Sequence, residues 1–453
     1  MWNINKQRLI EKGILLALCI ISLFPIHLII TEYHLSPQNE VNPEIELNAS
    51  TMTYEFDWDK RWNYTMDDEG QAIARDGDDN IYIAGNAGVP NPVLIKCKPN
   101  GEEIWSVQWN TDLNKPYCNS IAVTSDAVYI AGWGENLIGV INNMVFLVKY
   151  DHNHNLLWEK TWGYKNIDNF CHDLTADMNG DVYFTGYIKD GSISGSANIS
   201  IVKYYSDGTQ AWNATWNGFG NLTDSGKALA LDENRNVYVT GYTTESNYKI
   251  ITLKYNTSGF LQWERYWNGT YMSRAEDICI DSNNLYLSGF TNYTSGNFPG
   301  GEGVLIKYNT SGSYKWNTTW GDFSINDFLG PIYVLDDVLF CGGYNYPDGQ
   351  ENYLIEFELN GNLRGYEMIE KVGTESYHEI VGSSNDELYI VGEVEENGDN
   401  DIFLKNFQPI TEDEEPNDKD GPDDSISGYP RFMMIIIIFS TLLIVYKVRT
   451  KKN

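Results

Sequence analysis

Positive charge is scarce in this chain of 453 residues, which has 31 Lys and Arg against 63 Asp and Glu and a formal net charge of -32. Proteins that bind nucleic acid need clustered Lys and Arg to displace counterions from phosphate groups. The composition therefore excludes a nucleic-acid partner. Aromatic residues make up 14% of the chain and there are 40 glycines, a combination that favours turn-rich β structure.

Cysteine is also rare, and no two cysteines are close in sequence. Cys19 lies in an apolar segment, and the other five are scattered singly, at Cys97, Cys118, Cys171, Cys279 and Cys341. Without a CxxC pair, the sequence gives no support for a zinc site or a dithiol redox centre. Cys118 and Cys171 stand at equivalent positions of adjacent repeats, so a disulfide between them is possible if their Cα atoms lie within about 7 Å.

Long apolar runs occur only near the two ends. Residues 13–30 follow a basic segment, 1–12, and are predicted to be a signal anchor or a cleaved signal peptide, although no small-x-small cleavage site precedes Thr31. Residues 431–447 are predicted to be a transmembrane helix before a basic tail, 448–453. Because basic flanks stay in the cytoplasm, the region between the two runs is expected on the extracytoplasmic side of the cell membrane.

That region has three predicted parts. Residues 31–53 are a linker, residues 54–408 hold the repeats, and residues 409–430 form an acidic, Pro-containing stalk. Asn-x-Ser/Thr sequons occur only between the apolar runs, which fits a glycosylated exterior. The candidate glycosylation sites are Asn48, Asn63, Asn198, Asn213, Asn221, Asn256, Asn268, Asn292, Asn309 and Asn317.

A motif of six residues recurs seven times and ends one residue after a glycine. The copy VYVTGY at 237–242 returns as IYIAGN, VYIAGW, VYFTGY, LYLSGF, LFCGGY and LYIVGE. The marker glycines are Gly85, Gly132, Gly186, Gly241, Gly289, Gly343 and Gly392. Each copy contains a short strand, the marker strand, a third strand such as IITLKY at 250–255 and a strand with Trp-x-x-x-Trp. Four strands per repeat, arranged radially, predict an all-β, seven-bladed β-propeller.

The Trp pairs support this interpretation, because a spacing of four keeps both rings on one face of a strand, where they can pack between adjacent blades. The pairs are Trp58/Trp62, Trp105/Trp109, Trp158/Trp162, Trp212/Trp216, Trp263/Trp267 and Trp316/Trp320. The last repeat stops without such a strand, and FDWDKRW at 56–62 precedes the first repeat. The N-terminal strand is therefore expected to complete the seventh blade, which closes the ring. The sixth repeat is degraded, with NLRGYEM at 362–368 in place of a Trp pair.

The unit Asp-x-x-x-Asn-Val-Tyr-Val-Thr-Gly-Tyr, followed by Leu-Lys-Tyr-Asn-x-x-Gly-x-x-x-Trp, resembles the prokaryotic β-propeller repeat called SBBP. The resemblance covers about residues 54–408. It implies a seven-bladed propeller on a secreted or cell-surface protein, with binding or scaffold roles and no shared catalytic residues.

Three hairpin turns carry an Asp-x-Asp/Asn-x-Asp/Asn pattern, the opening of a calcium loop. Their residues are Asp76, Asp78 and Asn80; Asp177, Asn179 and Asp181; and Asp232, Asn234 and Asn236. No Gly stands at the sixth position and no Glu at the twelfth, and Asp and Asn are ordinary turn formers. We interpret these residues first as turn formers. The alternative is that they bind calcium, which is the one cofactor that the sequence suggests.

A lysine recurs at one position of six repeats, and Glu356 replaces it in the sixth. Such repetition predicts a structural contact, with the stem packed and the head paired with a turn carboxylate. The lysines are Lys96, Lys149, Lys203, Lys254, Lys307 and Lys405.

A binding site is predicted at one mouth of the central channel, where the innermost strands start. The aligned position varies in charge and type, as expected of a pocket; the alternative is that these are solvated strand starts. The residues are Gln71, Asn119, His172, Lys227, Glu276, Pro331 and His378. His172, Glu276 and His378 are considered together as a metal site or as groups that titrate between pH 5 and 8.

Enzyme patterns are missing. A sialidase-like site needs several converging Arg residues to bind a carboxylate, and the repeats hold few Arg residues. The GSISG sequence at 191–195 lies in a variable loop instead of a nucleophile elbow. A quinoprotein dehydrogenase would have eight blades and adjacent cysteines. The predicted function is a non-enzymatic, membrane-anchored surface protein that binds or scaffolds a glycan, peptide or protein partner. The alternative is an extracellular hydrolase or lyase that acts on glycans.

Overall fold

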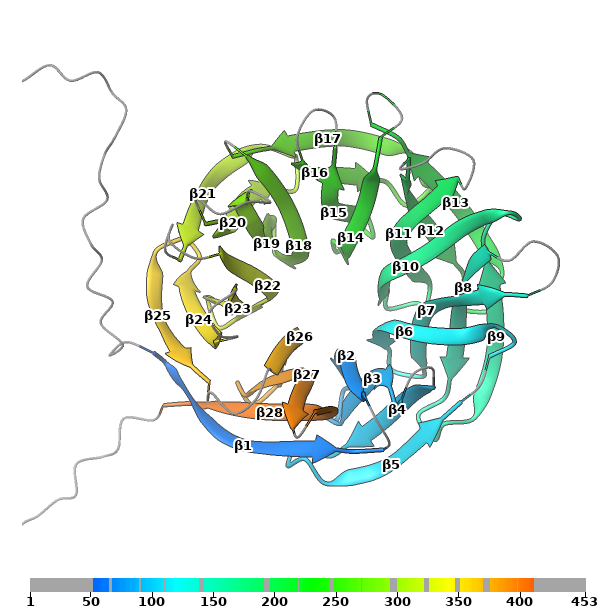
Figure 1. Cartoon of the computed structure of the whole chain (residues 1–453), viewed down its shortest axis with the longest axis horizontal. Coiled ribbons are helices and arrows are strands. Elements are labelled where there is room, and N and C mark those ends of the chain that lie inside the picture. The colour runs from blue at the N-terminus through cyan, green and yellow to red at the C-terminus, as the bar shows by residue number, and fades with distance from the viewer. Residues whose placement is uncertain are drawn as a thin grey trace, which may run out of the picture. The chain divides into compact units, whose positions relative to one another are not determined.

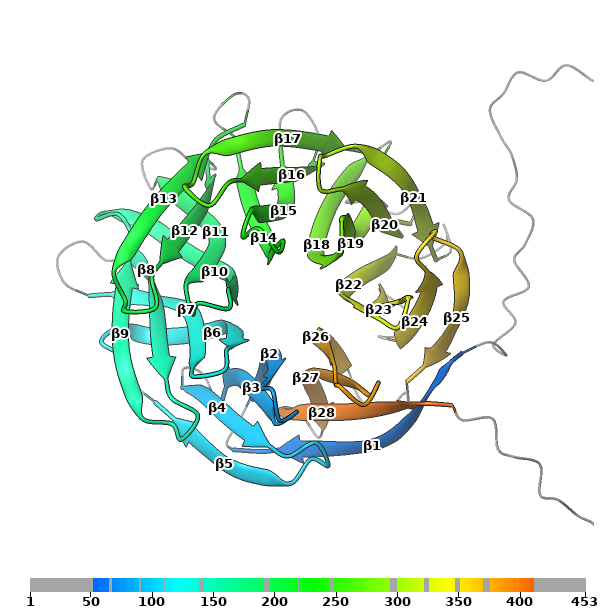
Figure 2. The same ribbon diagram turned by 180° about the vertical axis from the view of Figure 1, so that it is seen from behind.

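The computed structural model describes residues 52–410 apart from 65–66, 89–90, 110, 138–141, 191–195, 219, 221, 245–247, 270, 294–299, 322–325, 347–350, 370–374 and 397. These ranges form seven four-stranded antiparallel sheets, arranged as blades around a central channel (Figure 1). The view from behind shows the same ring with its inner strands around an open centre (Figure 2). The predicted seven-bladed propeller of four-stranded blades is confirmed.

The blades follow the chain, each from its innermost to its outermost strand. Blades one to three are β2 (Glu69–Arg75), β3 (Ile81–Asn86), β4 (Pro92–Cys97) and β5 (Glu103–Gln108); β6 (Asn114–Val123), β7 (Val128–Asn136), β8 (Asn142–Tyr150) and β9 (Leu156–Trp162); β10 (Ile167–Ala176), β11 (Val182–Asp190), β12 (Asn198–Tyr204) and β13 (Gln210–Trp216). Blades four to six are β14 (Asp224–Leu231), β15 (Val237–Thr243), β16 (Lys249–Tyr255) and β17 (Leu261–Trp267); β18 (Met272–Asp281), β19 (Asn284–Tyr293), β20 (Glu302–Asn309) and β21 (Tyr314–Trp320); β22 (Asn326–Leu335), β23 (Val338–Tyr346), β24 (Asn352–Glu358) and β25 (Leu363–Met368).

The seventh blade joins the two ends of the array. Its strands are β26 (Glu375–Gly382), β27 (Leu388–Glu396), β28 (Asp399–Pro409) and, outermost, β1 (Tyr54–Trp62). Strand β1 pairs with β28 from Tyr54↔Pro409 to Trp62↔Ile402. The predicted closure by the N-terminal strand is therefore correct, and it gives β28 a partner on both sides.

Six of the seven blades share the same aromatic contact. The tyrosine of the marker strand is fully buried in six blades, and its ring lies 5.9–6.3 Å from the first Trp of the outer strand of the same blade, as for Tyr238 and Trp263. In five of the six blades that Trp also lies over a hairpin glycine of the next blade with positive φ; an added Cβ at Gly259, for example, would collide with Trp212. In blade one, Trp105 instead faces His154 of blade two, with ring centroids 5.1 Å apart. The Trp rings therefore pack between adjacent blades, as predicted.

Trp109 is an exception to the prediction that both members of each Trp pair lie on an outer strand. Strand β5 ends at Gln108, so Trp109 follows the strand, whereas the second Trp of the other five pairs lies within one. The Trp109 amide still donates a hydrogen bond to the Pro92 carbonyl at 3.2 Å. Pro92 has no N–H and cannot donate a second hydrogen bond to Trp109, whereas the equivalent residue of blade two is Val145, which pairs with Trp162. The strand position predicted for Trp109 is therefore wrong.

The packing role of Trp109 is retained all the same. Its ring is 9% exposed and belongs to a core cluster with residues of blade two, where it lies 6.1 Å from the Tyr150 ring. The indole Nε1–H has no hydrogen-bond partner among the described residues. Apolar packing across the blade boundary, and not pairing within its own strand, is thus what holds this side chain.

The repeated lysine completes the contact of tyrosine and tryptophan. In blades one to five its ammonium group lies 4.7–5.0 Å from the centre of the marker tyrosine ring, a cation–π geometry. Four of these lysines also approach a turn carboxylate, most closely Lys203 and Asp181 at 2.9 Å. This agrees with the predicted structural role.

Glu356 departs from the lysine pattern because it receives the N-terminal strand. Its buried carboxylate accepts hydrogen bonds from the Thr53 amide at 2.9 and 3.0 Å, the Thr53 hydroxyl at 2.9 Å and the Tyr54 amide at 3.2 Å. The Tyr54 ring also packs against Phe340, the residue that replaces the marker tyrosine in blade six, at 4.8 Å. The sixth repeat is therefore specialised to fasten the segment before β1.

Within the described ranges no helix is long and apolar enough to cross a membrane. Both predicted spans, 13–30 and 431–447, lie outside these ranges, as do nearly all of the predicted linker and stalk, so these assignments stay predictions.

Candidate ligand site in the central channel

One structural device places a side chain of every blade in the channel. The pairing between the first and second strands skips one residue, or two in blade six, directly after the residue opposite the marker glycine. Such a β-bulge turns the extra side chain away from the regular pleat. The bulged positions are the predicted channel residues Gln71, Asn119, His172, Lys227, Glu276, Pro331 and His378.

The bulge also explains why the marker residue is glycine. In six blades it pushes a carbonyl of the first strand against the marker residue, so that an added Cβ at Gly241 would collide with the carbonyl of Ser225. In blade six the obstacle at Gly343 is the side chain of Ile355. The recurring glycine and the varied channel residue are therefore two parts of one local structure.

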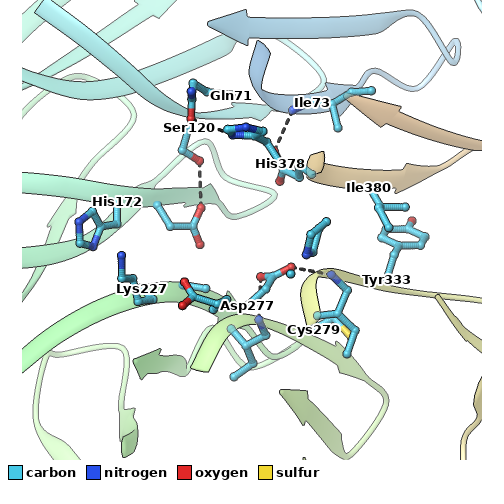
Figure 3. Close-up of a pocket in the computed structure, with 18 of the residues that line it drawn as sticks. Gln71, Ile73, Ser120, His172, Lys227, Asp277, Cys279, Tyr333, His378 and Ile380 are labelled. Carbon is cyan, nitrogen blue, oxygen red and sulfur yellow. Dashed lines mark hydrogen bonds between the residues drawn. The ribbon is translucent and has the colours of Figure 1, made fainter. Parts of the chain in front are cut away.

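All seven bulged residues line a single cavity of about 1210 Å³ that runs through the channel. Figure 3 shows Gln71, His172, Lys227 and His378 arranged around it, on strands from four different blades. The structure thus brings the predicted ring together. Whether the ring binds a ligand stays a prediction.

The histidines differ from the prediction that they titrate between pH 5 and 8. Burial lowers the pKa of His172 to about 3 and that of His378 to about 4, so both rings are neutral at pH 7. The Nδ1 atom of His172 lies 2.7 Å from the Gly226 carbonyl, and that of His378 lies 3.1 Å from the Gln71 side-chain oxygen. Among the described residues no group of three or more His, Cys, Asp or Glu has the geometry of a metal site.

One side of the channel carries two cations from blades four and five. Burial lowers the pKa of Lys227 to about 8, and the Arg274 charge acts in the same direction while Glu276 opposes it. Arg274 contacts Glu276 at 2.7 Å, and its guanidinium group lies 5.1 Å from the Tyr242 ring centre. The Lys227 amine therefore faces a partly desolvated channel.

Three partly buried carboxyl groups beside the bulges join neighbouring blades. Asp173 accepts from the Leu229 amide, Asp277 from the Ile332 amide and Glu379 from the Ile73 amide, each at 2.8 Å. Figure 3 shows two of these bonds, at Asp277 and Ile73. Burial raises the pKa of Asp173 to about 6, that of Asp277 to about 7 and that of Glu379 well above its usual range. Sequence reasoning missed these residues, although an acid follows the bulged position in blades three, five and seven.

An aromatic layer above the bulges was also missed. The residue after each marker glycine is aromatic in blades two to six, and Asn86 and Glu393 replace it in blades one and seven. The rings contact their cross-strand neighbours: Tyr117 and Trp133 at 5.8 Å, Phe170 and Tyr187 at 4.6 Å, and Phe328 and Tyr344 at 4.8 Å. The sixth residue of the marker motif, which is aromatic in five repeats, is the feature of the sequence that could have predicted this layer.

The three Asp/Asn-rich turns use their first carboxylate to hold the turn itself. Asp76 Oδ1 accepts from the amides of Asp78 and Asn80 at 3.0 and 2.9 Å, and Asp177 and Asp232 accept from their own turns in the same way. Their other oxygens accept from the marker tyrosines. The contacts support turn formation, and calcium binding stays a prediction.

Two further predictions concern single residue types. The possible Cys118–Cys171 disulfide is wrong, because Cys97, Cys118, Cys171, Cys279 and Cys341 are all free thiols. Of the sequons, Asn48 and Asn221 lie outside the described ranges, and Asn63, Asn213, Asn268 and Asn317 are exposed. Asn256 and Asn309 cap hairpin turns, which offers a structural reason for their Asn-x-Ser sequence.

The fold and its channel define the class of protein, a seven-bladed β-propeller. More particularly, residues 218–249 match the family model described as SBBP, beta-propeller repeat. This match covers the start of blade four and confirms the resemblance to SBBP-type repeats.

Several solved structures resemble this chain at low sequence identity. A gluconolactonase from Xanthomonas campestris is 11% identical over 76% of this chain and 88% of its own, with a TM-score of 0.37. A glucose dehydrogenase is 11% identical over 77% and 99%, with a TM-score of 0.40. An apocarotenoid oxygenase variant from Synechocystis is 12% identical over 66% and 71%, with a TM-score of 0.42. These similarities carry no functional argument, and no curated protein matches the chain.

Proposed function

We propose that this is a non-enzymatic, membrane-anchored cell-surface protein that uses its propeller to bind or scaffold a glycan, peptide or protein partner. The observation that carries the proposal is the contrast at the bulge. One side chain of each blade is turned into a common cavity, and these side chains differ while the glycine opposite stays the same. Variation on a fixed backbone is what a binding surface requires.

The binding part is tested with the purified full-length chain on immobilised glycans and peptides. The triple variant His172→Ala/Glu276→Ala/His378→Ala is expected to lose ligand retention with nearly unchanged thermal unfolding. The control is Lys98→Ala/Glu102→Ala, which removes an exposed ion pair on an outer hairpin. Retention by the triple variant would contradict a channel site and direct the search to the loops after the marker glycines.

The anchoring part rests on the two apolar runs and their basic flanks. Protease treatment of intact cells is expected to release the propeller by cutting within residues 409–430. Complete protection until the cells are lysed would contradict the proposed topology.

The second candidate, a glycan hydrolase or lyase, is favoured by the raised pKa of Asp277 and Glu379, since general acids need such values. Their hydrogen bonds to the next blade instead give them a structural reason to be there. Cleavage of polysaccharides by the purified protein, abolished in Asp277→Asn, would reverse the ranking.

A further inference from the structure

Four consecutive blades present an ordered set of polar groups at the channel. Their bulged residues form an arc of the channel wall and are Asn119, His172, Lys227 and Glu276; all four line the cavity. The Lys227 ammonium group makes no hydrogen bond or ion pair with any residue of the described ranges, although burial disfavours its charge. A partly desolvated cation is weakly stabilised by the protein alone, so an anion from outside the chain would gain by reaching it.

Two basic groups lie close together at this part of the channel, in contrast to the acidic chain as a whole. Lys227 and Arg274 are two cations, and Glu276 is the carboxylate that pairs with Arg274 among the described residues. Two of the deeper acids add less negative charge than their number indicates, because burial raises the pKa of Asp277 to about 7 and that of Glu379 well above its usual range, whereas Asp173, with a pKa of about 6, is largely ionised at pH 7. An anion is therefore favoured here over a cation.

Hydrogen-bond acceptors without a donor precede Lys227 in the same arc. The side-chain oxygen of Asn119 is buried and has no partner among the described residues. The Nδ1–H of His172 is assigned as the donor to the Gly226 carbonyl, so that the neutral ring leaves Nε2 as an acceptor. A ligand that satisfies this side must bring O–H or N–H donors.

A wall of stacked rings continues the arc beyond Glu276. Phe290 and Phe328 lie 5.0 Å apart edge to face, and Phe328 stacks on Tyr344 at 4.8 Å with 12° between the planes. All three line the cavity, and Tyr344 remains 41% exposed. An exposed aromatic face of this kind suits a flat ring with apolar C–H groups and a polar edge.

We infer that this arc binds the acidic sugar unit of a glycan, such as a uronic acid. Its carboxylate pairs with the Lys227 ammonium group, a hydroxyl donates to His172 Nε2, and a ring of the same glycan packs on Phe290, Phe328 and Tyr344. A saccharide is favoured because one ring carries the carboxylate, several O–H donors and an apolar face. The inference rests on the proposed binding function and names its ligand class.

Calorimetric titration of the full-length chain tests the inference with a trimer of galacturonic acid, its methyl ester and a neutral trimer of galactose. The free acid is expected to bind, and the ester and the neutral trimer are expected to bind at least about tenfold more weakly, since a charge-assisted hydrogen bond is lost. Lys227→Met is expected to lose about tenfold or more in affinity for the free acid, and Lys227→Arg to stay within about threefold. Lys98→Met, at an exposed turn, is the matched control, and melting temperatures check folding.

Equal affinity for acid and ester, or unchanged affinity in Lys227→Met, would overturn the inference. The same holds if the uronate does not bind but a tripeptide with a free C-terminal carboxylate does. Failure of this ligand class is distinguishable from failure of the proposed function. If the His172→Ala/Glu276→Ala/His378→Ala variant loses a different ligand, the channel is a binding site and only the sugar assignment falls.

Discussion

The outer part of each blade and the channel part of the same blade follow opposite rules. The outer contact of tyrosine, tryptophan and lysine is nearly the same in blades one to five, with distances that differ by a few tenths of an ångström. The bulged position changes from amide to imidazole to amine to carboxylate. Identical contacts hold the blades to one another, and varied side chains meet only in the cavity. A repeat protein can therefore change its site without changing its packing.

The two parts are joined where the chain closes and where the marker glycine meets the bulge. Damage to the repeated part is expected to affect stability strongly, and damage to the varied part is expected to affect binding or pH dependence. The following changes test this division, from the largest expected effect to the smallest.

Deletion of residues 50–63 removes strand β1 and the contacts of Thr53 and Tyr54 with Glu356. Strand β28 then becomes an edge, and the buried faces of Tyr54 and Trp62 are lost. The expected result is aggregation or loss of cooperative unfolding, measured by light scattering and calorimetry. Deletion of residues 31–45 is the comparison, and equal stability of the two would remove the closure argument.

Glu356→Lys restores the lysine of the other repeats but places a cation against the amides of Thr53 and Tyr54. Loss of a buried, hydrogen-bonded carboxylate and its replacement by an unpaired charge are expected to cost about 3–5 kcal/mol in the free energy of unfolding. Chemical denaturation measures this. Glu233→Lys, in an exposed turn, is the control; a small effect of Glu356→Lys would mean that the sixth repeat is merely degraded.

Gly241→Ala tests the link between marker and bulge. The methyl group collides with the Ser225 carbonyl, so the bulge in blade four must shift, at a cost of about 1–3 kcal/mol. Gly77 lines the same cavity without any atom within 4 Å of an added Cβ, and the stability of Gly77→Ala is expected to stay near that of the wild type. Similar unfolding free energies for the two variants would show that the marker glycine has another role.

Asp277→Asn changes the pH dependence of stability. The folded pKa of about 7 lies above the usual value of 3.8, so the stability associated with the protonated form is present in acid and is lost as the pH rises through 7. Each pKa unit of difference corresponds to about 1.4 kcal/mol. The variant is expected to lose less stability between pH 4 and 8 than the wild type does. Asp57→Asn, on the exposed face of β1, is the control, and parallel profiles for Asp277→Asn and wild type would contradict a buried, protonated carboxyl.

The sequence alone determined the blade number, the closure and the position of the channel ring, because each depends on a period that recurs along the chain. The Gly–Trp repeat predicts seven equivalent sheets. The strand at 56–62, which precedes the first repeat, can only complete the seventh blade, because the last repeat lacks its fourth strand. The period is less informative about strand ends, since Trp109 keeps its spacing but falls just outside β5. Glu356 was recognised as the exception, but its reason lies 303 residues earlier, at Thr53.

The tertiary structure decided what the repeats do to one another. The neutrality of His172 and His378 follows from burial, which no spacing reports. The links of Asp173, Asp277 and Glu379 to the next blade, the free Cys118 and Cys171 thiols and the aromatic wall at Phe328 depend on distances between blades. Sequence periodicity gives the position of a residue within its own blade, whereas desolvation and contact across the channel arise only when all seven blades close around it.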